Sequence, residues 1–288
     1  MASPAIAHYG TTIIETPAPT GVDQRAIPYT GALAATLQLL ELYGFEPLIE
    51  NMYAGVGRQY IRRRGQITDP DYIEFDAFTS YRAVQRPSTA TARVGDTIFR
   101  LTHQHPVEVF RQAAAQSLLT PANRSANANS FLCGDSLWLL ARGPNGQLFE
   151  LGPTQLTRRD NNVVHIWTAT ETLDQTTSDF CTQFGMQEAQ SALFHDVAQV
   201  KYLQRQRPGM TIGLLTPLPG EQVTPRWSDD IFLEAGYSHY RMGSPDKQRT
   251  LAASREAFPD GGDVSFVYFR DSYLELVQVQ EDDPTLAG

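Results

Sequence analysis

The stretch VVHIWTATETLDQTTSDFCTQFGM, residues 163–186, decides the fold, because it changes from one kind of secondary structure to another without a long connection. Its first residues are apolar and β-favouring, which is typical of a strand. Further along, Phe180 and Phe184 lie four residues apart and Gly185 follows them. That spacing indicates a helix over 174–185, and glycine is a common helix end. The stretch therefore predicts a strand that leads directly into a helix.

The same order of a strand, a helix and further strands recurs four times along the chain. Helices are predicted over 31–46, 105–119, 174–185 and 245–258. The strands that open the four segments are expected within 6–16, 96–102, 162–173 and 234–244. Two closing strands, GQLFELGP at 146–153 and SYLELVQV at 272–279, each contain a glutamate. This repetition predicts a duplicated architecture, and the polar segment 154–162 is the expected boundary between its halves.

Composition narrows the class of protein. The chain has 288 residues, of which 41% are hydrophobic, so one large or two ordinary domains with a proper core can form. The net charge is −9 and the only basic run is Arg62-Arg63-Arg64, which argues against a nucleic-acid partner. We also expect no membrane span and no secretory signal. Cys133 and Cys181 form no CxxC motif, which favours reduced thiols in a cytoplasmic protein.

A carboxylate interrupts the last apolar strand of the sequence. In FRDSYLELVQVQ, residues 269–280, Glu275 stands between Leu274 and Leu276. A glutamate that faces inward needs a cation or a donor, because burying an unpaired charge is very costly. Arg270 lies five residues back (275 − 270), so on a regular strand it faces the other way. On an outward face Glu275 would be an ordinary solvent-facing residue, whereas on an inward face a metal ion is its expected partner.

These segments resemble the vicinal oxygen chelate superfamily, which includes glyoxalase I, bleomycin-resistance proteins and extradiol ring-cleaving dioxygenases. His165 in VVHIWTATETLDQTTSDFCTQFGM, His239 in AGYSHYRMGSPD and Glu275 in YFRDSYLELVQ match the strands that open and close the family's βαβββ modules. The resemblance implies an α+β fold of four such modules, paired into two domains. Each domain is expected to be a curled mixed sheet that forms a cup with its helices outside. The expected division is an N-terminal domain without metal at 1–153 and a metal-carrying domain at 154–288.

The resemblance implies a metal site with His165, His239 and Glu275 as its ligands. Two histidines and one carboxylate are the facial triad of non-haem Fe(II) oxygenases. The third module ends in MTIGLLTPL, which contains neither a carboxylate nor a histidine as a fourth ligand, so an open site is favoured. The family's Pro-x-Gly turn before the glutamate is missing, and a slip of one residue would move Glu275 to the other face of its strand.

Five further side chains complete the expected site. His195 is the expected acid–base residue, and Tyr268 and Tyr273 are expected to orient a substrate hydroxyl. Trp167 and Tyr240 are expected to line the substrate pocket, where an aromatic ring can stack on a substrate. Packing in the core is the alternative role for Trp167, Tyr268 and Tyr273.

The first half of the chain departs from the pattern at one ligand position. Aligning Pro106 with Pro245, each at the start of a predicted helix, places Arg100 where His239 stands. Arginine stays protonated and cannot ligate a metal ion. An ion pair between Arg100 and Glu150 is therefore expected to replace the metal in this half.

A second layout of the ligands remains open. His8 and Glu150 also stand at ligand positions of the family. Two enlarged modules would combine them with residues of the other half into a glyoxalase-like tetrad of His8, Glu150, His165 and Glu275.

The function favoured at this point is that of an Fe(II) extradiol-type dioxygenase. Its metal would chelate two neighbouring oxygens of a catechol or hydroxy-ketone and leave a position for O₂. One alternative is a non-redox isomerase or lyase of the glyoxalase type, using Mn, Co, Ni or Zn. Another is a metal-free small-molecule-binding protein of the resistance or sequestration type. The expected partners are a small-molecule substrate, O₂ for an oxygenase and a second copy of the chain in a homodimer, but neither nucleic acid nor a membrane.

Overall fold

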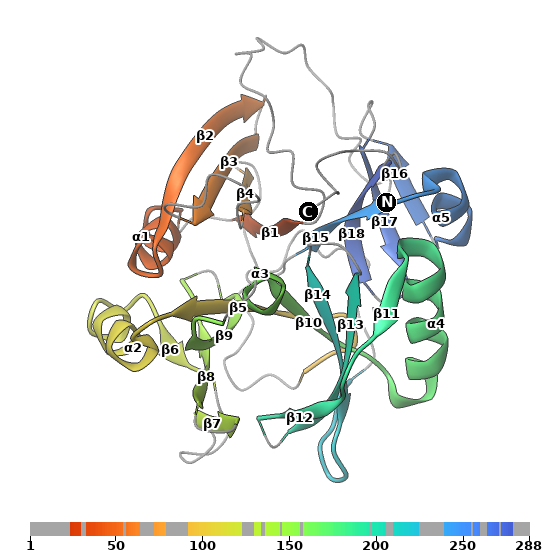
Figure 1. Ribbon diagram of the computed structural model, residues 1–288. Coiled ribbons are helices and arrows are strands. Elements are labelled where there is room, and N and C mark those ends of the chain that lie inside the picture. Colours follow the sequence, from red (N-terminus) through yellow and green to blue (C-terminus); the bar gives the residue numbers. More distant parts are fainter. Residues whose placement is uncertain are drawn as a thin grey trace.

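The computed structural model describes residues 24–29, 33–53, 56–63, 72–78, 92–122, 130–133, 136–144, 146–155, 158–195, 197–205, 210–224, 239–254, 256–259, 264–270 and 272–278. Each of the four expected modules opens with a strand and a helix (Figure 1). These pairs are β1 (Gln24–Tyr29) with α1 (Leu33–Leu42), β5 (Thr97–His103) with α2 (Pro106–Ala115), β10 (Val163–Trp167) with α4 (Leu173–Phe184), and β15 (His239–Ser244) with α5 (Lys247–Ala253).

The remaining strands complete the modules in chain order. They are β2 (Phe45–Tyr53), β3 (Val56–Arg63) and β4 (Tyr72–Phe78); β6 (Thr120–Pro121), β7 (Ser130–Cys133), β8 (Ser136–Arg142) and β9 (Leu148–Pro153); β11 (Met186–Glu188), β12 (Ala192–Phe194), β13 (Ala198–Arg205) and β14 (Thr211–Pro217); and β16 (Glu256–Pro259), β17 (Val264–Phe269) and β18 (Ser272–Gln278). Two short helices, α3 (Arg158–Asn161) and η1 (Thr170–Thr172), lie between the named elements.

The strands form two curled mixed sheets. The eight-stranded sheet runs β16-β17-β18-β15-β1-β4-β3-β2. The ten-stranded sheet runs β11-β13-β14-β10-β5-β9-β8-β6, with β12 also paired to β13 and β7 also paired to β8. In every module the opening strand pairs in parallel with the closing strand, and two opening strands join antiparallel at the centre of each sheet. The expected α+β fold of four βαβββ modules is confirmed.

The modules pair differently from the expected order. The expected division between residues 153 and 154 falls between β9 and β10, which both belong to the ten-stranded sheet. That sheet combines the second and third modules, and the eight-stranded sheet combines the first and fourth. A repeat in the sequence reveals the modules but not their partners, because every opening strand offers the same kind of edge for pairing.

The opening strand expected within 6–16, which contains His8, lies outside the described residues. Among the residues that the structure describes, the strand before α1 is β1, in the segment QRAIPY. The sequence pattern predicts no strand in this segment.

The main core lies between the sheets and their helices. On β10, Val164 and Ile166 pack in one apolar cluster with helix residues such as Phe180 and Phe184 of α4. The alternating residues of the ten-stranded sheet face away from these helices, as strand geometry requires. We call the helix-free side of each sheet its inner face; on the ten-stranded sheet it carries a second apolar cluster around Trp167.

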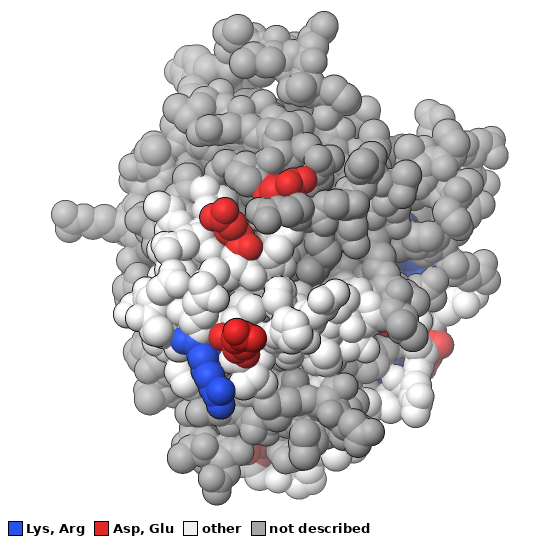
Figure 2. Space-filling view, turned by 60° about the vertical axis from the view of Figure 1, so that its left-hand side comes forward, with Lys and Arg blue, Asp and Glu red and all other residues white. Residues whose placement is uncertain are grey.

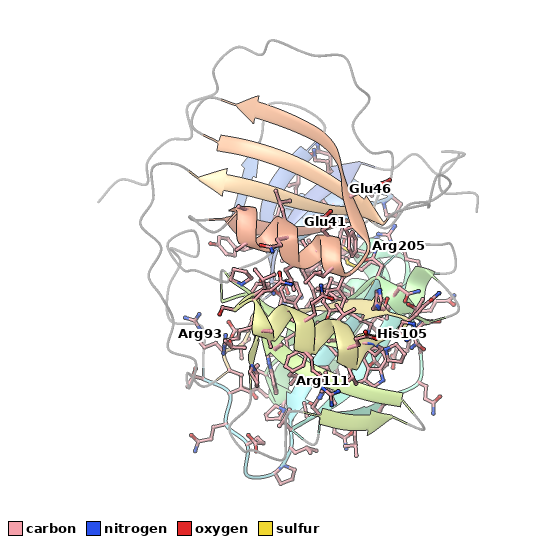
Figure 3. The ribbon with its side chains drawn as sticks, turned by 90° about the vertical axis from the view of Figure 1, so that its left-hand side faces the viewer. Glu41, Glu46, Arg93, His105, Arg111 and Arg205 are labelled. Atoms are coloured by element: carbon pink, nitrogen blue, oxygen red, sulfur yellow. The ribbon has the colours of Figure 1, made fainter. Side chains whose placement is uncertain are left out.

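Helix α4 also joins the two sheets. The rings of Phe180 and Phe184 lie 5.4 and 5.0 Å from the ring of Phe269 on β17. Arg270 forms an ion pair with Asp179 of α4, so this arginine has a carboxylate partner other than Glu275. On the other side of the molecule α1 and α2 lie one above the other, with His105 at the start of α2 (Figure 3).

Helix ends follow the expected local chemistry. Gly185 ends α4 with φ 64°, a left-handed conformation that glycine adopts without strain. Helix α5 begins at Lys247 rather than at Pro245, because the Asp246 side chain accepts a hydrogen bond from the backbone N–H of Arg249 and caps the helix.

Within the described residues, no helix is both long and apolar enough to span a membrane. On the face shown in Figure 2, the described acidic and basic side chains are scattered and do not gather into a single patch. Cys181 is a free thiol, as expected.

Candidate functional site

A buried carboxylate organises the inner face of the ten-stranded sheet. Glu150 of β9 accepts a hydrogen bond from Arg100 Nε at 2.7 Å on its Oε2 atom. His195 Nε2 lies 3.3 Å from its Oε1 atom, and His165 Nδ1 lies 3.8 Å from Oε2. Tyr202 adds a hydroxyl 3.4 Å from His165 Nε2. We call these five residues the inner cluster.

Strand register brings the inner cluster together. Arg100 and Glu150 are direct partners in the parallel pair of β5 and β9. His165 is the partner of Gly213 in the parallel pair of β10 and β14. The antiparallel pair of β5 and β10 then places His165 opposite Ile98, so the two parallel pairs meet at the centre of the sheet.

Charges in the inner cluster are balanced without a further ion. Burial raises the pKa of the Glu150 carboxyl, but Arg100 and the two histidines outweigh it and hold that pKa well below its usual range. Burial opposes the charge of Arg100, yet Glu150 raises the net pKa of the guanidinium. Burial also lowers the pKa of His165 from 6.5 to about 3, so its imidazole is neutral at neutral pH. The pair of Arg100 and Glu150 is therefore ionised, and His165 beside it is not.

Arg100 is held by more than its carboxylate. Its Nη1 atom donates to the carbonyl oxygen of Asp160 at 2.9 Å, and its guanidinium lies 4.3 Å from the ring centroid of Trp138. The ring of Trp138 covers Gly152, where an added Cβ would meet it at 2.1 Å. The arginine is therefore fixed from several sides in the position beside Glu150.

The turn between β12 and β13 delivers His195. This residue has φ 48°, a left-handed conformation that is uncommon for a side chain other than glycine. Its imidazole is buried against Glu150 and lies 4.6 Å from the ring of Phe194. The sequence-based assignment of His195 to a site with an acid–base role stays a prediction, but the structure places the residue in the inner cluster.

The residues of the inner cluster do not fit a divalent ion. Arg100 occupies a position where a metal site needs a ligand, and Gly213, opposite His165, offers no side chain. A Cβ at position 213 would meet His165 Cδ2 at 2.5 Å, so the imidazole fills this space. Across the described part of the chain, no group of three His, Cys, Asp or Glu residues could hold a metal ion. The ion pair of Arg100 and Glu150 expected from the sequence is confirmed.

The three predicted metal ligands do not lie in one sheet. His165 is on β10 of the ten-stranded sheet, whereas His239 and Glu275 are on β15 and β18 of the eight-stranded sheet. The side chains of His239 and Glu275 lie outside the described part of the structure. A metal-carrying cup was expected from residues 154–288 alone. The structure instead divides the strands of these residues between the two sheets.

The structure brings together two of the four residues of the alternative tetrad. Glu150 and His165 lie side by side, as this layout requires. His8 lies outside the described residues, and Glu275 is on a strand of the other sheet.

The remaining predicted site residues are divided between the two faces. Trp167 shares the inner face with His165, as expected from their spacing, and packs with Ile98 and Leu215. Tyr240 instead belongs to the main core, where burial raises the pKa of its hydroxyl. Successive residues of a strand face opposite sides of the sheet. The sequence did not indicate which side of this sheet the helices cover.

Tyr268 and Tyr273 are direct partners in the antiparallel pair of β17 and β18. They therefore belong to the eight-stranded sheet and not to the inner cluster. Tyr268 is buried, and the side chain of Tyr273 lies outside the described part.

Sequence reasoning missed Tyr202 and Trp138. Tyr202 follows Ala198 and Val200 at alternating positions of β13, so the period of two places it on the inner face. Trp138 carries no comparable signal, because its role depends on Gly152 of the neighbouring strand.

Several solved structures have a similar fold. Glyoxalase I from Zea mays has 13% identity to this chain, with 89% of this chain and 92% of that one covered and a TM-score of 0.58. A single-residue mutant of the same enzyme gives a TM-score of 0.60 at the same identity and coverage. A protein from Bacillus subtilis, named as a dioxygenase without proof of activity, has 13% identity over 90% of this chain and 84% of that one, with a TM-score of 0.52.

No protein-family model matches the sequence, and no curated protein is significantly similar to it in sequence. The similarity to the solved structures described above shows that the chain has the vicinal oxygen chelate fold, as the sequence indicated. At this level of identity the similarity establishes the fold alone.

Proposed function

We propose that the inner face of the ten-stranded sheet is a metal-independent binding site for a small molecule. One observation carries the proposal: Arg100 Nε lies 2.7 Å from Glu150 Oε2, and both side chains are almost fully buried. The guanidinium supplies the positive charge that a metal ion would bring to this carboxylate. Since a buried ion pair is disrupted only at a high cost in free energy, a divalent ion has to displace a well-held partner.

The surroundings of the inner cluster define the class of ligand. Apolar side chains surround the polar groups, and they are Ile98, Leu140, Trp167, Phe194, Val200 and Leu215. Ligand sites commonly combine such apolar walls with a few placed polar groups. The hydroxyl of the half-buried Tyr202, 3.4 Å from His165 Nε2, and the imidazole of His195, 3.3 Å from Glu150 Oε1, are polar groups on this face. We therefore propose a small molecule with an apolar or aromatic body and at least one hydrogen-bonding oxygen, such as a catechol or a hydroxy-ketone.

A thermal-shift experiment tests this function. Catechol and a small hydroxy-ketone are added to the full chain, with and without EDTA. A stabilisation that is equal in both conditions and that is reduced in Tyr202→Phe is expected. Gln187→Ala, at an exposed position of β11, is the matched control and should respond like the wild type. Stabilisation that requires an added divalent ion would contradict the proposal.

A metal-dependent enzyme is the second candidate. The observation in its favour is that His165 Nδ1 and Glu150 Oε2 lie 3.8 Å apart, so two groups of ligand type remain neighbours. On this candidate the fold would support an Fe(II) dioxygenase that uses O₂, or a glyoxalase-type isomerase that uses Mn, Co, Ni or Zn. Its ligands would be the tetrad of His8, Glu150, His165 and Glu275, and His195 would be its acid–base residue.

Oxygen consumption separates the metal-independent site from the Fe(II) dioxygenase. The full chain is incubated with Fe(II) and catechol in an oxygen electrode cell, and the wild type is compared with Glu275→Gln. The metal-independent site predicts no consumption above the rate of iron and catechol alone. Catalysed consumption that Glu275→Gln abolishes would establish the metal-dependent enzyme instead.

A further inference from the structure

The eight-stranded sheet repeats the plan of the ten-stranded sheet. In the ten-stranded sheet, the parallel pairs β5·β9 and β10·β14 meet through the antiparallel pair β5·β10. In the eight-stranded sheet, the parallel pairs β15·β18 and β1·β4 meet through the antiparallel pair β1·β15. Positions in the two sheets can therefore be matched through backbone register alone.

Distance to the following helix gives the first match. Arg100 lies five residues (105 − 100) before His105, the N-cap of α2. Arg241 lies five residues (246 − 241) before Asp246, the N-cap of α5. The two arginines thus occupy the same position in their modules.

Parallel register gives the same match independently. Arg100 is the direct partner of Glu150 in β5·β9. Arg241 is the direct partner of Glu275 in β15·β18. An arginine therefore stands beside the closing-strand glutamate in both sheets.

The antiparallel pairing of the opening strands at the centre of each sheet agrees with the two matches above. His165 is opposite Ile98, two residues before Arg100 (100 − 98). Ala26 is opposite His239, two residues before Arg241 (241 − 239). Ala26, and not His239, is therefore the counterpart of His165.

Burial of the neighbouring residues settles the face of the sheet. Tyr240 and Met242 on β15, and Leu274 and Leu276 on β18, are fully buried in the main core. Because successive residues of a strand alternate between faces, positions 241 and 275 belong to the inner face. The four main-core residues just named lie on the opposite face of the sheet.

We propose that Arg241 is the cation that balances Glu275, so that a second arginine–glutamate pair takes the position of a metal ion in the eight-stranded sheet. This goes beyond the proposed function, since it concerns the other sheet. It replaces the metal expected at Glu275 and corrects the alignment of Pro106 with Pro245. The caps of α2 and α5 shift that alignment by two residues, from His239 to Arg241.

A double-mutant cycle in the full chain tests the pair. Arg241→Met, Glu275→Gln and the double variant are compared by thermal unfolding in the presence of EDTA. Each single change is expected to lower Tm by roughly 5 °C or more, because it leaves one buried charge without its partner. The double variant is expected to lose clearly less than the sum of the two, because no unpaired charge remains.

Two further cycles serve as references. Arg100→Met with Glu150→Gln is expected to show the same coupling. Lys201→Met with Asp174→Asn breaks an ion pair whose aspartate is 98% exposed, so its effects should add. A single variant too unstable to purify still decides the question, since the double variant is then expected to yield folded protein.

The outcomes are distinct. Additive losses at 241 and 275, or a double variant as unstable as its singles, would overturn the inference. So would a divalent ion that copurifies with the wild type and is lost in Glu275→Gln. Coupling at 100 and 150 without coupling at 241 and 275 would overturn this inference and leave the proposed function intact.

Discussion

At the scale of single residues, one side chain separates the inner cluster from a metal site. Glu150 and His165 remain in place as groups of ligand type, and Arg100 excludes an ion between them. Arg100→His is therefore expected to create a divalent-ion affinity, because the new imidazole joins a carboxylate and an imidazole that are already neighbours. Isothermal titration with Zn²⁺ or Co²⁺ measures it, and dissociation constants of about 10 μM or tighter are expected, worth roughly 7 kcal/mol or more.

The control for this change places an imidazole elsewhere. Arg111→His, at an exposed position of α2, makes the same substitution away from the inner cluster (Figure 3). It should bind no more strongly than the wild type. Equal affinity in the wild type and in Arg100→His would show that Arg100 does not exclude the ion.

Acid should destabilise the protein through the same residues. The pKa of His165 falls from 6.5 to about 3 on folding, so its stabilising contribution is complete above pH 6.5 and is lost as the pH falls from 6.5 towards 3. The lowered pKa of Glu150 adds a further loss below about pH 4.5. Each group contributes a slope of at most about 1.4 kcal/mol per pH unit.

Urea unfolding at pH 7.5, 6.0 and 5.0 measures this dependence. In His165→Gln the loss between pH 7.5 and 5.0 should be smaller than in the wild type, since one titrating group is gone. Gln187→Ala, at an exposed position of β11, changes no titratable group and should leave the profile unchanged. An identical slope in His165→Gln and the wild type would contradict the account.

The individual residues of the inner cluster were predictable to different degrees. Charge chemistry predicted the ion pair of Arg100 and Glu150, although the alignment of Pro106 with Pro245 that drew attention to Arg100 was wrong by two residues. His165 was found from its position between a strand and a helix, but its neutral state beside a buried arginine–glutamate pair was not predicted. Tyr202 joins the cluster from β13 of the same module, and only the alternation along that strand could have indicated it.

At the scale of elements, the close approach of β10 and β14 requires a glycine. A Cβ at position 213 would lie 2.5 Å from His165 Cδ2 and 3.0 Å from Val200 Cγ2. Gly213→Ala is therefore expected to cost about 1–3 kcal/mol of unfolding free energy through overpacking. Urea unfolding measures the change, and the exposed Gln187→Ala is the comparison. A neutral Gly213→Ala would mean that the imidazole moves easily and that the inner cluster is not tightly held.

Most elements were predictable from local patterns. The closing strand expected within 146–153 and the helix end at Gly185 coincide with β9 and with the end of α4. The start of α5 was placed too early, at Pro245, because the capping by Asp246 was not considered. That error of two residues misplaced the counterpart of Arg100.

At the scale of the whole molecule, the ten-stranded sheet is built from one continuous segment. Residues 92–224 contain all of its strands, whereas 154–288 contains parts of both sheets. The fragment 92–224 is therefore expected to fold cooperatively, although less stably than the full chain, because it loses the contacts of α4 with β15 and β17. The fragment 154–288 is expected not to fold, since β10 and β15 each lose a central partner.

Near-ultraviolet circular dichroism with urea unfolding distinguishes the two fragments. A cooperative transition in 154–288 and none in 92–224 would support the division at residue 153 and contradict the pairing of the modules described above. This pairing could not be predicted from the sequence. Local patterns define each module, but the choice of partner depends on how four similar edges compete within the folded chain.

Metal content tests the central claim most directly, namely that an arginine, and not a metal ion, balances the carboxylate of the inner cluster. The full chain is purified without chelator and its Mn, Fe, Co, Ni and Zn are measured by mass spectrometry, beside Arg100→His treated in the same way. The account predicts far less than one ion per chain in the wild type and an increase in Arg100→His. One ion per chain in the wild type that Glu150→Gln removes would contradict it.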